Sequence, residues 1–526
     1  MHVQRTLLAQ AVLWAIACIS AAQAQTRSDD QALPEVVVSS TPFNAGEGAQ
    51  ILAPAKVLSG DELRNKLGNS LGDTLSQELG VSASAFGAGA SRPIIRGMEG
   101  PRVKILQNGM SVSDVSSLSN DHAVAVDSAT ARQIEILRGP AALLYGSGAI
   151  GGLVNVINDR IPTELSTKPS GDAELRTSSV DRGASLSLSA DGAAGPIGLH
   201  VDGSLRNAGD YRIPGNAVLN DPESASGRLP NSFTRQNNLG LGASYIAGWG
   251  HIGASVGVLN DHYGIPTAEK SFIDLSQTRY DVDGLVKQPF AGFSTFKFKL
   301  GATDYKHTEK AQDGTPLTDF INKSTETRLE LTHLPLHGWR GTFGLQVEDS
   351  KFSALSAETG LPDTVPTTKS STLAGFLVEE RDFGPLRASA GMRVESVKRR
   401  PEAGAGLPDR HFDMGSYSLG GLWTFTPGYA FGTTLSIAQR APAVEELYSH
   451  GPHESTATFD IGDPMLQKET SRNIEISLQK TEGLVRWKAN LFQNRVRNFI
   501  FGRIDGTRVD SSGAIEADGE FMQRFW

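Results

Sequence analysis

The sequence predicts a mostly β protein, with an antiparallel transmembrane β-barrel behind a small N-terminal α/β domain. Three observations predict this fold. The chain opens with a secretory signal, it has no later apolar run long enough for a spanning helix, and from about residue 166 apolar and polar residues alternate again and again. The hydrophobic fraction is only 39%. This value suits strands that have a single apolar face.

The first 24 residues have the three parts of a cleavable signal peptide. His2 and Arg5 give a charged start, Leu7–Ile19 is apolar, and Ala22-Gln23-Ala24 is a small-residue cleavage site. The apolar part is shorter than the roughly 18–20 residues that span a bilayer. The only cysteine, Cys18, leaves with the signal. Any soft-metal ligands of the mature chain must therefore be His, Asp or Glu.

The charge balance disfavours a nucleic-acid partner. The full chain carries a formal net charge of −9, and loss of the +1 of Arg5 takes it to −10. A surface of this sign repels phosphate backbones and attracts cations.

Residues 166–526 are expected to form the barrel. In Phe343–Glu348, for example, Phe343, Leu345 and Val347 alternate with Gly, Gln and Glu, and similar alternation occurs in Phe296–Leu300 and in Val485–Leu491. By this pattern we count about 15 strands between residues 170 and 503, and Phe521–Trp526 begins another.

Residues 46–165 lack long alternating strands and are expected to form the α/β domain. Leucines from Leu63 to Leu79 recur at near-helical spacing within Asp61–Gly80, and Val103–Leu106 and Ile134–Leu137 have the composition of buried strands. Residues 25–45 are polar with prolines and should be a flexible tail.

The tail contains a valine triplet that could add as a strand to the sheet edge of a partner. This segment, Leu33-Pro34-Glu35-Val36-Val37-Val38, resembles a TonB box. The α/β domain adds Pro93–Gly97, Val103–Gly109 and Ile134–Pro140, and it ends with the glycine-rich Leu144–Ile157. Four such elements in this order resemble the plug of TonB-dependent outer-membrane receptors.

Asp121 and His122 are adjacent in a stretch that should form an outward-facing plug loop, and they offer a carboxylate and an imidazole, which zinc accepts. Glu358 lies at a strand-to-loop transition, and a later loop carries His450 and His453. Together these residues resemble the ZnuD-type zinc receptors. The resemblance implies that Asp121, His122, Glu358 and one of the two loop histidines bind the metal.

Other histidines are weaker candidates. His262, and His307 with Glu309, should lie on outer loops, where they could assist capture, although solvated surface side chains are the more ordinary interpretation.

The resemblance implies a monomeric outer-membrane receptor that imports zinc with energy delivered by TonB. It implies neither an enzyme nor a tightly bound cofactor, and its partners are TonB, membrane lipid and the metal. The alternative cargo is haem, with a loop histidine beside Arg440-Ala441-Pro442 and Glu446-Leu447-Tyr448 as axial ligand. A siderophore receptor is a weaker alternative. A passive pore or an adhesin, without energy coupling, is an alternative from another class of protein.

Receptors of this family have 22 strands, so a count of about 15–16 implies a C-terminally truncated barrel. We therefore expect an open or distorted sheet around the plug, and an inactive truncated receptor is a further alternative.

Overall fold

The computed structural model describes residues 55–138, 140–146, 148–267 and 270–526. The expected signal peptide and TonB box lie outside these residues. None of the helices in the described ranges is long and apolar enough to cross a membrane.

The described chain is dominated by strands, with a few short helices. The plug contains β1 (Ala55–Ser59), α2 (Gly60–Lys66), α3 (Leu71–Leu75), β2 (Val81–Ala85), β3 (Ser91–Ile95), η1 (Gly100–Arg102), β4 (Val103–Gln107), β5 (Met110–Ser111), η2 (Ser128–Thr130), β6 (Gln133–Leu137), η3 (Pro140–Tyr145) and β7 (Gly152–Ile157). The remainder contains β8 (Ser170–Ser178), β9 (Gly183–Ala194), β10 (Ile197–Ala208), β11 (Arg212–Asn216), β12 (Ser226–Arg228), β13 (Thr234–Ala247), β14 (Gly250–Gly264), β15 (Phe272–Lys287), β16 (Phe293–Lys310), β17 (Pro316–His333), β18 (Trp339–Ser356), β19 (Pro362–Phe383), β20 (Leu386–Pro401), β21 (Arg410–Thr426), β22 (Tyr429–Arg440), α4 (Val444–Tyr448), β23 (His450–His453), η4 (Glu454–Thr456), β24 (Thr458–Ile461), β25 (Glu469–Lys480), β26 (Trp487–Arg497), β27 (Arg503–Val509) and β28 (Phe521–Phe525).

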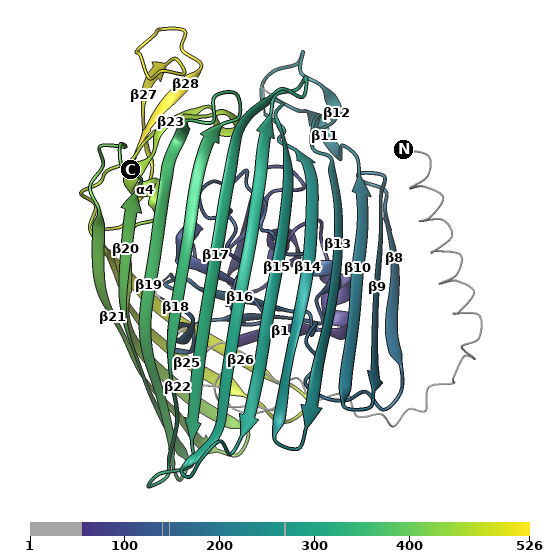
Figure 1. Ribbon diagram of the computed structural model, residues 1–526, viewed down its shortest axis with the longest axis vertical. Helices are drawn as coiled ribbons and strands as arrows, with labels where there is room; N and C mark the ends of the chain where they lie inside the picture. The colour runs from purple at the N-terminus through teal and green to yellow at the C-terminus, as the bar shows by residue number, and fades with distance from the viewer. Residues whose placement is uncertain (1–54, 139, 147, 268–269) are drawn as a thin grey trace. The chain divides into compact units, whose positions relative to one another are not determined.

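One large sheet of 15 strands curves around the plug (Figure 1). Its strands pair antiparallel with one another in chain order. Four strands of this part of the chain are not in the sheet: β11 and β12, which pair with each other, and β23 and β24, which lie between β22 and β25 in the chain. In the described residues β8 and β26 are the two ends of this sheet, and each pairs with one neighbour only. The expected strand number and the open sheet therefore agree with the structure.

The loops that join neighbouring strands are short along one rim of the sheet and long along the opposite rim. Only two residues, Gly248 and Trp249, join β13 to β14, whereas residues 441–468 join β22 to β25 and contain α4, β23 and β24. Short turns at one end and long loops at the other are typical of outer-membrane barrels, whose long loops face the outside. We therefore call the end that carries residues 441–468 the external end.

The faces of β18 confirm the expected alternation. Phe343, Leu345 and Val347 are 41%, 54% and 40% exposed on the outer face, whereas Gln346 is buried on the face that looks toward the plug. An outer apolar face and a polar inner face are what a lipid-facing strand requires.

The plug is built on a five-stranded sheet in the order β1-β6-β7-β4-β5, so the segments expected as buried strands are β4 and β6. The leucine-rich segment forms two short helices, with a break at residues 67–70. Ser70 starts α3, because its hydroxyl accepts a hydrogen bond from the Asp73 backbone N–H. Leu79, expected on the buried face, is 91% exposed because the helical repeat has ended before it.

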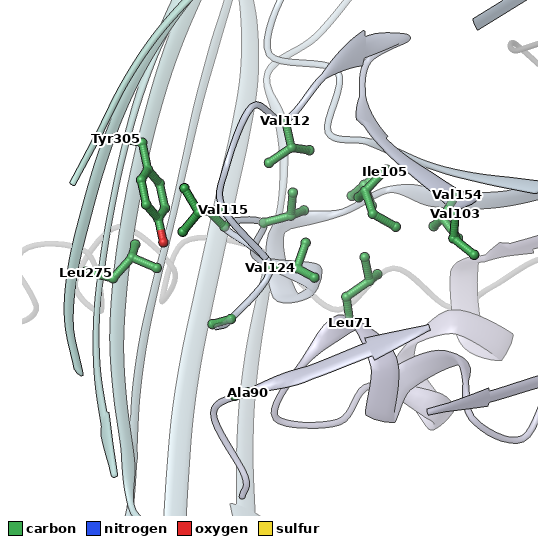
Figure 2. Packing of buried hydrophobic residues seen from close by; sticks show 14 of the residues in the cluster. Leu71, Ala90, Val103, Ile105, Val112, Val115, Val124, Val154, Leu275 and Tyr305 are labelled. Atoms are coloured by element: carbon green, nitrogen blue, oxygen red, sulfur yellow. The ribbon is translucent and has the colours of Figure 1, made fainter. Parts of the chain in front are cut away.

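The plug core continues onto the barrel wall. Figure 2 shows Val115 of the plug beside Leu275 of β15 and Tyr305 of β16, and these three residues and Val112 belong to one buried cluster. Tyr305 is fully buried. Apolar contact therefore fixes the plug segment after β5 against the wall near the external end.

The last strand differs from the expectation. Residues 521–525 do not begin another barrel strand, because β28 pairs with β27 and, in parallel, with β24. These strands form a separate four-stranded sheet in the order β23-β24-β28-β27, visible at the external end in Figure 1. We call it the external sheet.

Buried ion pairs also link plug and barrel. Arg102 of the plug donates to Glu469 of β25, and Arg440 of β22 donates to Glu469 and Glu446. Glu469 is completely buried. One barrel carboxylate is therefore shared by two guanidinium groups, one from each domain, and Glu446 supplies a second carboxylate to Arg440.

We expect Glu469→Gln to destabilise the chain by about 3–5 kcal/mol, because it leaves the two buried guanidinium groups without their shared carboxylate. Thermal unfolding in detergent measures the change. Arg472→Gln is the matched control, since Arg472 is exposed on the same strand. Equal melting temperatures for the two variants would contradict a role for Glu469 in joining plug and barrel.

Candidate metal-binding site

Asp121 and His122 lie in the plug loop between β5 and η2, and both side chains are completely buried. Tyr263 of β14 fixes this loop, because its hydroxyl donates to the Asp121 carbonyl oxygen at 3.1 Å and accepts from the Ala123 N–H at 2.9 Å. Gly89 permits the approach of Tyr263, because a Cβ at Gly89 would overlap the tyrosine side chain. The loop is thus anchored to the barrel at the residues that carry the candidate ligands.

The hydrogen bond of His122 defines which ring nitrogen is free. Its Nδ1 lies 3.2 Å from the Val115 carbonyl oxygen. A carbonyl oxygen can only accept, so Nδ1 carries the proton and the neutral ring has its lone pair on Nε2. This is the arrangement that metal-binding histidines usually adopt.

Glu309 joins the site from the barrel. It follows Tyr305 and His307 at two-residue intervals on β16, so the three side chains share the inner face of the strand. Glu309 is 1% exposed and His307 is fully buried, which corrects the expectation of solvated loop residues. His262 likewise lies on a strand, β14, where its Nδ1 is 2.5 Å from Asp274.

His307 lies beside the site. Its Nδ1 is 2.8 Å from the Tyr305 hydroxyl, its ring stacks on Phe320, and its centroid is 4.6 Å from that of His122. These contacts hold the His122 ring from one side.

His453 comes from the external sheet. Positions 450 and 453 are three residues apart on β23, so their side chains leave opposite faces of the strand. His453 is 4% exposed and points to Asp121 and Glu309, whereas His450 is exposed and lies against Phe459. The β23 backbone is tied to β19, since the Thr364 hydroxyl donates to the Pro452 carbonyl.

The four side chains converge on one point. Nε2 of His122 and Nε2 of His453 each lie 3.4 Å from Asp121 Oδ2 and 3.4 Å from Glu309 Oε1. One ligand atom from each residue lies within 4.8 Å of all the others. A tetrahedral ion with bonds of roughly 2.0–2.2 Å separates its ligand atoms by roughly 3.3–3.6 Å. The four carboxylate-to-imidazole spacings therefore match four of the six edges of a zinc-sized tetrahedron, and the other two are at most 4.8 Å.

The electrostatics of the cluster favour a cation. Burial disfavours the ionised Asp121, but the neighbouring imidazoles of His122 and His453 outweigh it and hold the pKa of Asp121 well below its usual range. Burial also opposes charge on His453, yet Asp121 raises the pKa of His453 well above its ordinary value. In the described residues the Asp121 carboxylate oxygens have no hydrogen-bond partner at normal distance. Buried carboxylate oxygens that lie beside imidazoles and accept no hydrogen bond are suited to a divalent cation.

Two sequence candidates lie apart from this cluster. Glu358 is exposed in the turn after β18, and His450 is exposed on the opposite face of β23. The structure therefore brings together Asp121, His122 and His453 and adds Glu309. The signal for Glu309 is the two-residue spacing of Tyr305, His307 and Glu309, which places all three on one strand face.

The residues considered for haem have other contacts. Both terminal guanidinium nitrogens of Arg440 donate to Glu446, which also accepts from the Ala443 N–H. The Tyr448 hydroxyl donates to the Pro408 carbonyl. These groups hold residues 441–448 in place, and their polar atoms are used within the protein.

Two family descriptions match the chain. "TonB dependent receptor-like, beta-barrel" matches residues 158–520, and "TonB-dependent Receptor Plug Domain" matches residues 48–153.

Among curated proteins, the chain is 22% identical over 464 residues to the vitamin B12 transporter BtuB of Photobacterium profundum. The matched region covers 86% of this chain and 68% of that protein. The chain is 23% identical over 523 residues to the hemin receptor of Yersinia pestis, covering 91% of this chain and 73% of that protein.

Two solved structures show the same fold. The Serratia marcescens hemophore receptor HasR, solved with its hemophore HasA and heme, matches with a TM-score of 0.72 at 17% identity, over 90% of this chain and 77% of that one. The copper transporter OprC matches with a TM-score of 0.72 at 15% identity, over 90% and 75%.

We expect Tyr263→Phe to destabilise the protein by about 1–3 kcal/mol, because it leaves the buried Ala123 N–H without an acceptor. Thermal unfolding of the purified chain measures the loss. Tyr280→Phe on β15 is the control, since that side chain is 56% exposed. If Tyr263→Phe melts like Tyr280→Phe, the hydroxyl does not anchor the loop.

Proposed function

This chain belongs to the TonB-dependent receptors, which are transport proteins of the Gram-negative outer membrane and not enzymes, and we propose that its cargo is zinc. The cargo binds as Zn²⁺ between Asp121, His122, Glu309 and His453. Plug and barrel each supply part of this set, and the external sheet supplies the rest.

One observation carries the proposal: two buried carboxylates and two imidazoles present ligand atoms to one point, with carboxylate-to-imidazole spacings that fit a zinc-sized ion. Two carboxylates and two neutral imidazoles carry a charge of −2, which a divalent cation cancels. Zinc accepts this nitrogen and oxygen set without a thiolate, and imidazole and carboxylate ligands are common in its sites. The fold is also compatible with a transition metal as cargo, since OprC, which has the same fold, is named a copper transporter.

The three origins of the ligands suggest how zinc is released. Asp121 and His122 belong to the plug, whereas Glu309 belongs to the barrel wall and His453 to the external sheet. A pull on the plug from the periplasmic side separates the first two from the others. The ion then loses half of its ligands, and no covalent bond has to be broken.

TonB is the partner that supplies this pull, since TonB-dependent receptors work with TonB. Leu33–Val38 is the segment we propose as its contact, because an extended valine-rich segment can pair with an open sheet edge. The outer membrane then needs no energy source of its own.

Haem is the second candidate, and it is favoured by the names of two similar proteins, a hemin receptor and a hemophore receptor. Haem would need an open pocket with an axial ligand. His453, the buried loop histidine, already lies within 3.4 Å of two carboxylates. Titration of the purified chain with Zn²⁺ and, separately, with haem distinguishes the two cargoes.

We expect Asp121→Ala, His122→Ala, Glu309→Gln and His453→Gln each to weaken Zn²⁺ binding by about tenfold or more, because each removes one ligand from a site without thiolates. Calorimetry on metal-stripped protein measures this. The Asp121→Ala/His122→Ala double variant should not greatly exceed the worse single variant, because neighbouring groups that act together are not additive.

Glu358→Gln and His450→Gln are matched controls, since both residues are exposed and lie outside the cluster. They should bind Zn²⁺ like the parent chain. Unchanged affinity in Glu309→Gln, or haem binding with no Zn²⁺ binding in the parent chain, would refute the zinc assignment.

A further inference from the structure

A row of four cationic side chains crosses the outer face of the barrel. Lys323 of β17 is directly opposite Lys351 of β18, Lys351 is opposite Lys369 of β19, and Lys369 is opposite Arg400 of β20. All four are exposed. Neighbouring strands lie roughly 4.8 Å apart, so the row places four positive charges within about 15 Å.

The row lies just above the lipid-facing belt. On β18, Lys351 shares the outer face with Phe343, Leu345 and Val347, and it is the member nearest the external end. On β20, Arg400 stands in the same relation to Met392 and Val394, which are 41% and 49% exposed. The cations therefore stand at the height where the outer leaflet changes from acyl chains to headgroups.

The two central lysines are not neutralised within the protein. Lys323 has Asp304 at 2.9 Å, and Arg400 has Asp409 at 3.7 Å. In the described chain Lys351 and Lys369 have no carboxylate oxygen within 4.0 Å of the ammonium group, although they are cross-strand partners. Like charges directly opposite each other destabilise a sheet.

A shallow depression of about 490 Å³ runs along this row. Its lining includes the four cations, hydroxyl groups such as those of Thr325 and Ser371, and the carboxylates of Asp304 and Asp349. Asp304 is paired with Lys323, and the four cations outnumber the two carboxylates. Hydroxyl and ammonium groups are donors, and together they suit phosphate oxygens.

We propose that this row binds the phosphate groups of an anionic lipid of the outer leaflet, whose acyl chains lie on the apolar belt below. The ligand class is a phosphorylated glycolipid of the lipid A type. Its phosphates neutralise Lys351 and Lys369 and remove their repulsion. The site lies on the outer face and is independent of the zinc proposal.

The purified full chain in a zwitterionic detergent provides the test. Diphosphoryl lipid A, monophosphoryl lipid A, phosphatidylcholine and inorganic phosphate are the four probes, and native mass spectrometry measures binding. We expect the diphosphoryl form to bind most tightly and inorganic phosphate and phosphatidylcholine to bind weakly. Equal binding of inorganic phosphate would overturn a lipid site, because the belt would then contribute nothing.

The Lys351→Gln/Lys369→Gln variant should bind diphosphoryl lipid A about tenfold more weakly or worse, because two phosphate partners are lost. Lys351→Arg/Lys369→Arg should keep the binding, and Arg235→Gln, which removes an exposed cation from β13, should leave it unchanged. Without lipid, the Gln variant should melt at or above the parent temperature because repulsion is relieved. Parent-like lipid binding by the Gln variant, or a lower melting temperature without lipid, would overturn the proposal.

Discussion

The burial of the Asp121 and Glu309 carboxylates at one point is the constraint on which the site depends. One comes from the plug and the other from the barrel wall, and their oxygens share the same two imidazoles at 3.4 Å. Two negative charges out of water are costly unless a cation or imidazolium stands between them. In the absence of metal, a charged His453 meets this need, which is why its pKa is raised. In the proposed site a divalent ion would replace that charge and take all four groups as ligands.

Two of the contacts that hold the plug in the barrel differ in chemistry. Arg102 and Glu469 form a buried ion pair, shared with Arg440, in which the positive charge is permanent and is not displaced by the cargo. At the candidate site the loop is held by the neutral hydroxyl of Tyr263 and by the carboxylate-imidazole contacts. Neutral hydrogen bonds are weaker than charge-assisted ones. Of these two attachments, the one at the candidate site is the one that the proposed cargo would change.

Much of the fold follows from local pattern, whereas the site depends on strand boundaries. Alternation of Phe343, Leu345 and Val347 predicts an outer face without knowledge of neighbours, and the adjacent Asp121 and His122 stand out in the plug. The choice between His450 and His453 depends on which face of the strand each occupies. Side chains alternate between faces, so two residues three positions apart lie on opposite faces. Glu309 is hard to predict as a ligand because β16 extends to Lys310, past the point where the pattern predicts a loop. Leu79 and β28 differ from expectation for a related reason: the end of a helix, and a parallel partner far earlier in the chain, depend on contacts that a local pattern does not contain.

The same alternation lets one strand face two media. On β16 the inner face carries Tyr305, His307 and Glu309, while Asp304 and Lys306 point outward. A shift of pairing by one residue would exchange the faces, since the side-chain period is two. It would turn the Lys306 ammonium group toward the candidate site and the Glu309 carboxylate toward the outside. The register that buries Glu309 opposite the plug is thus also the register that places Asp304 beside Lys323 on the outer face, so selection for either surface preserves the other.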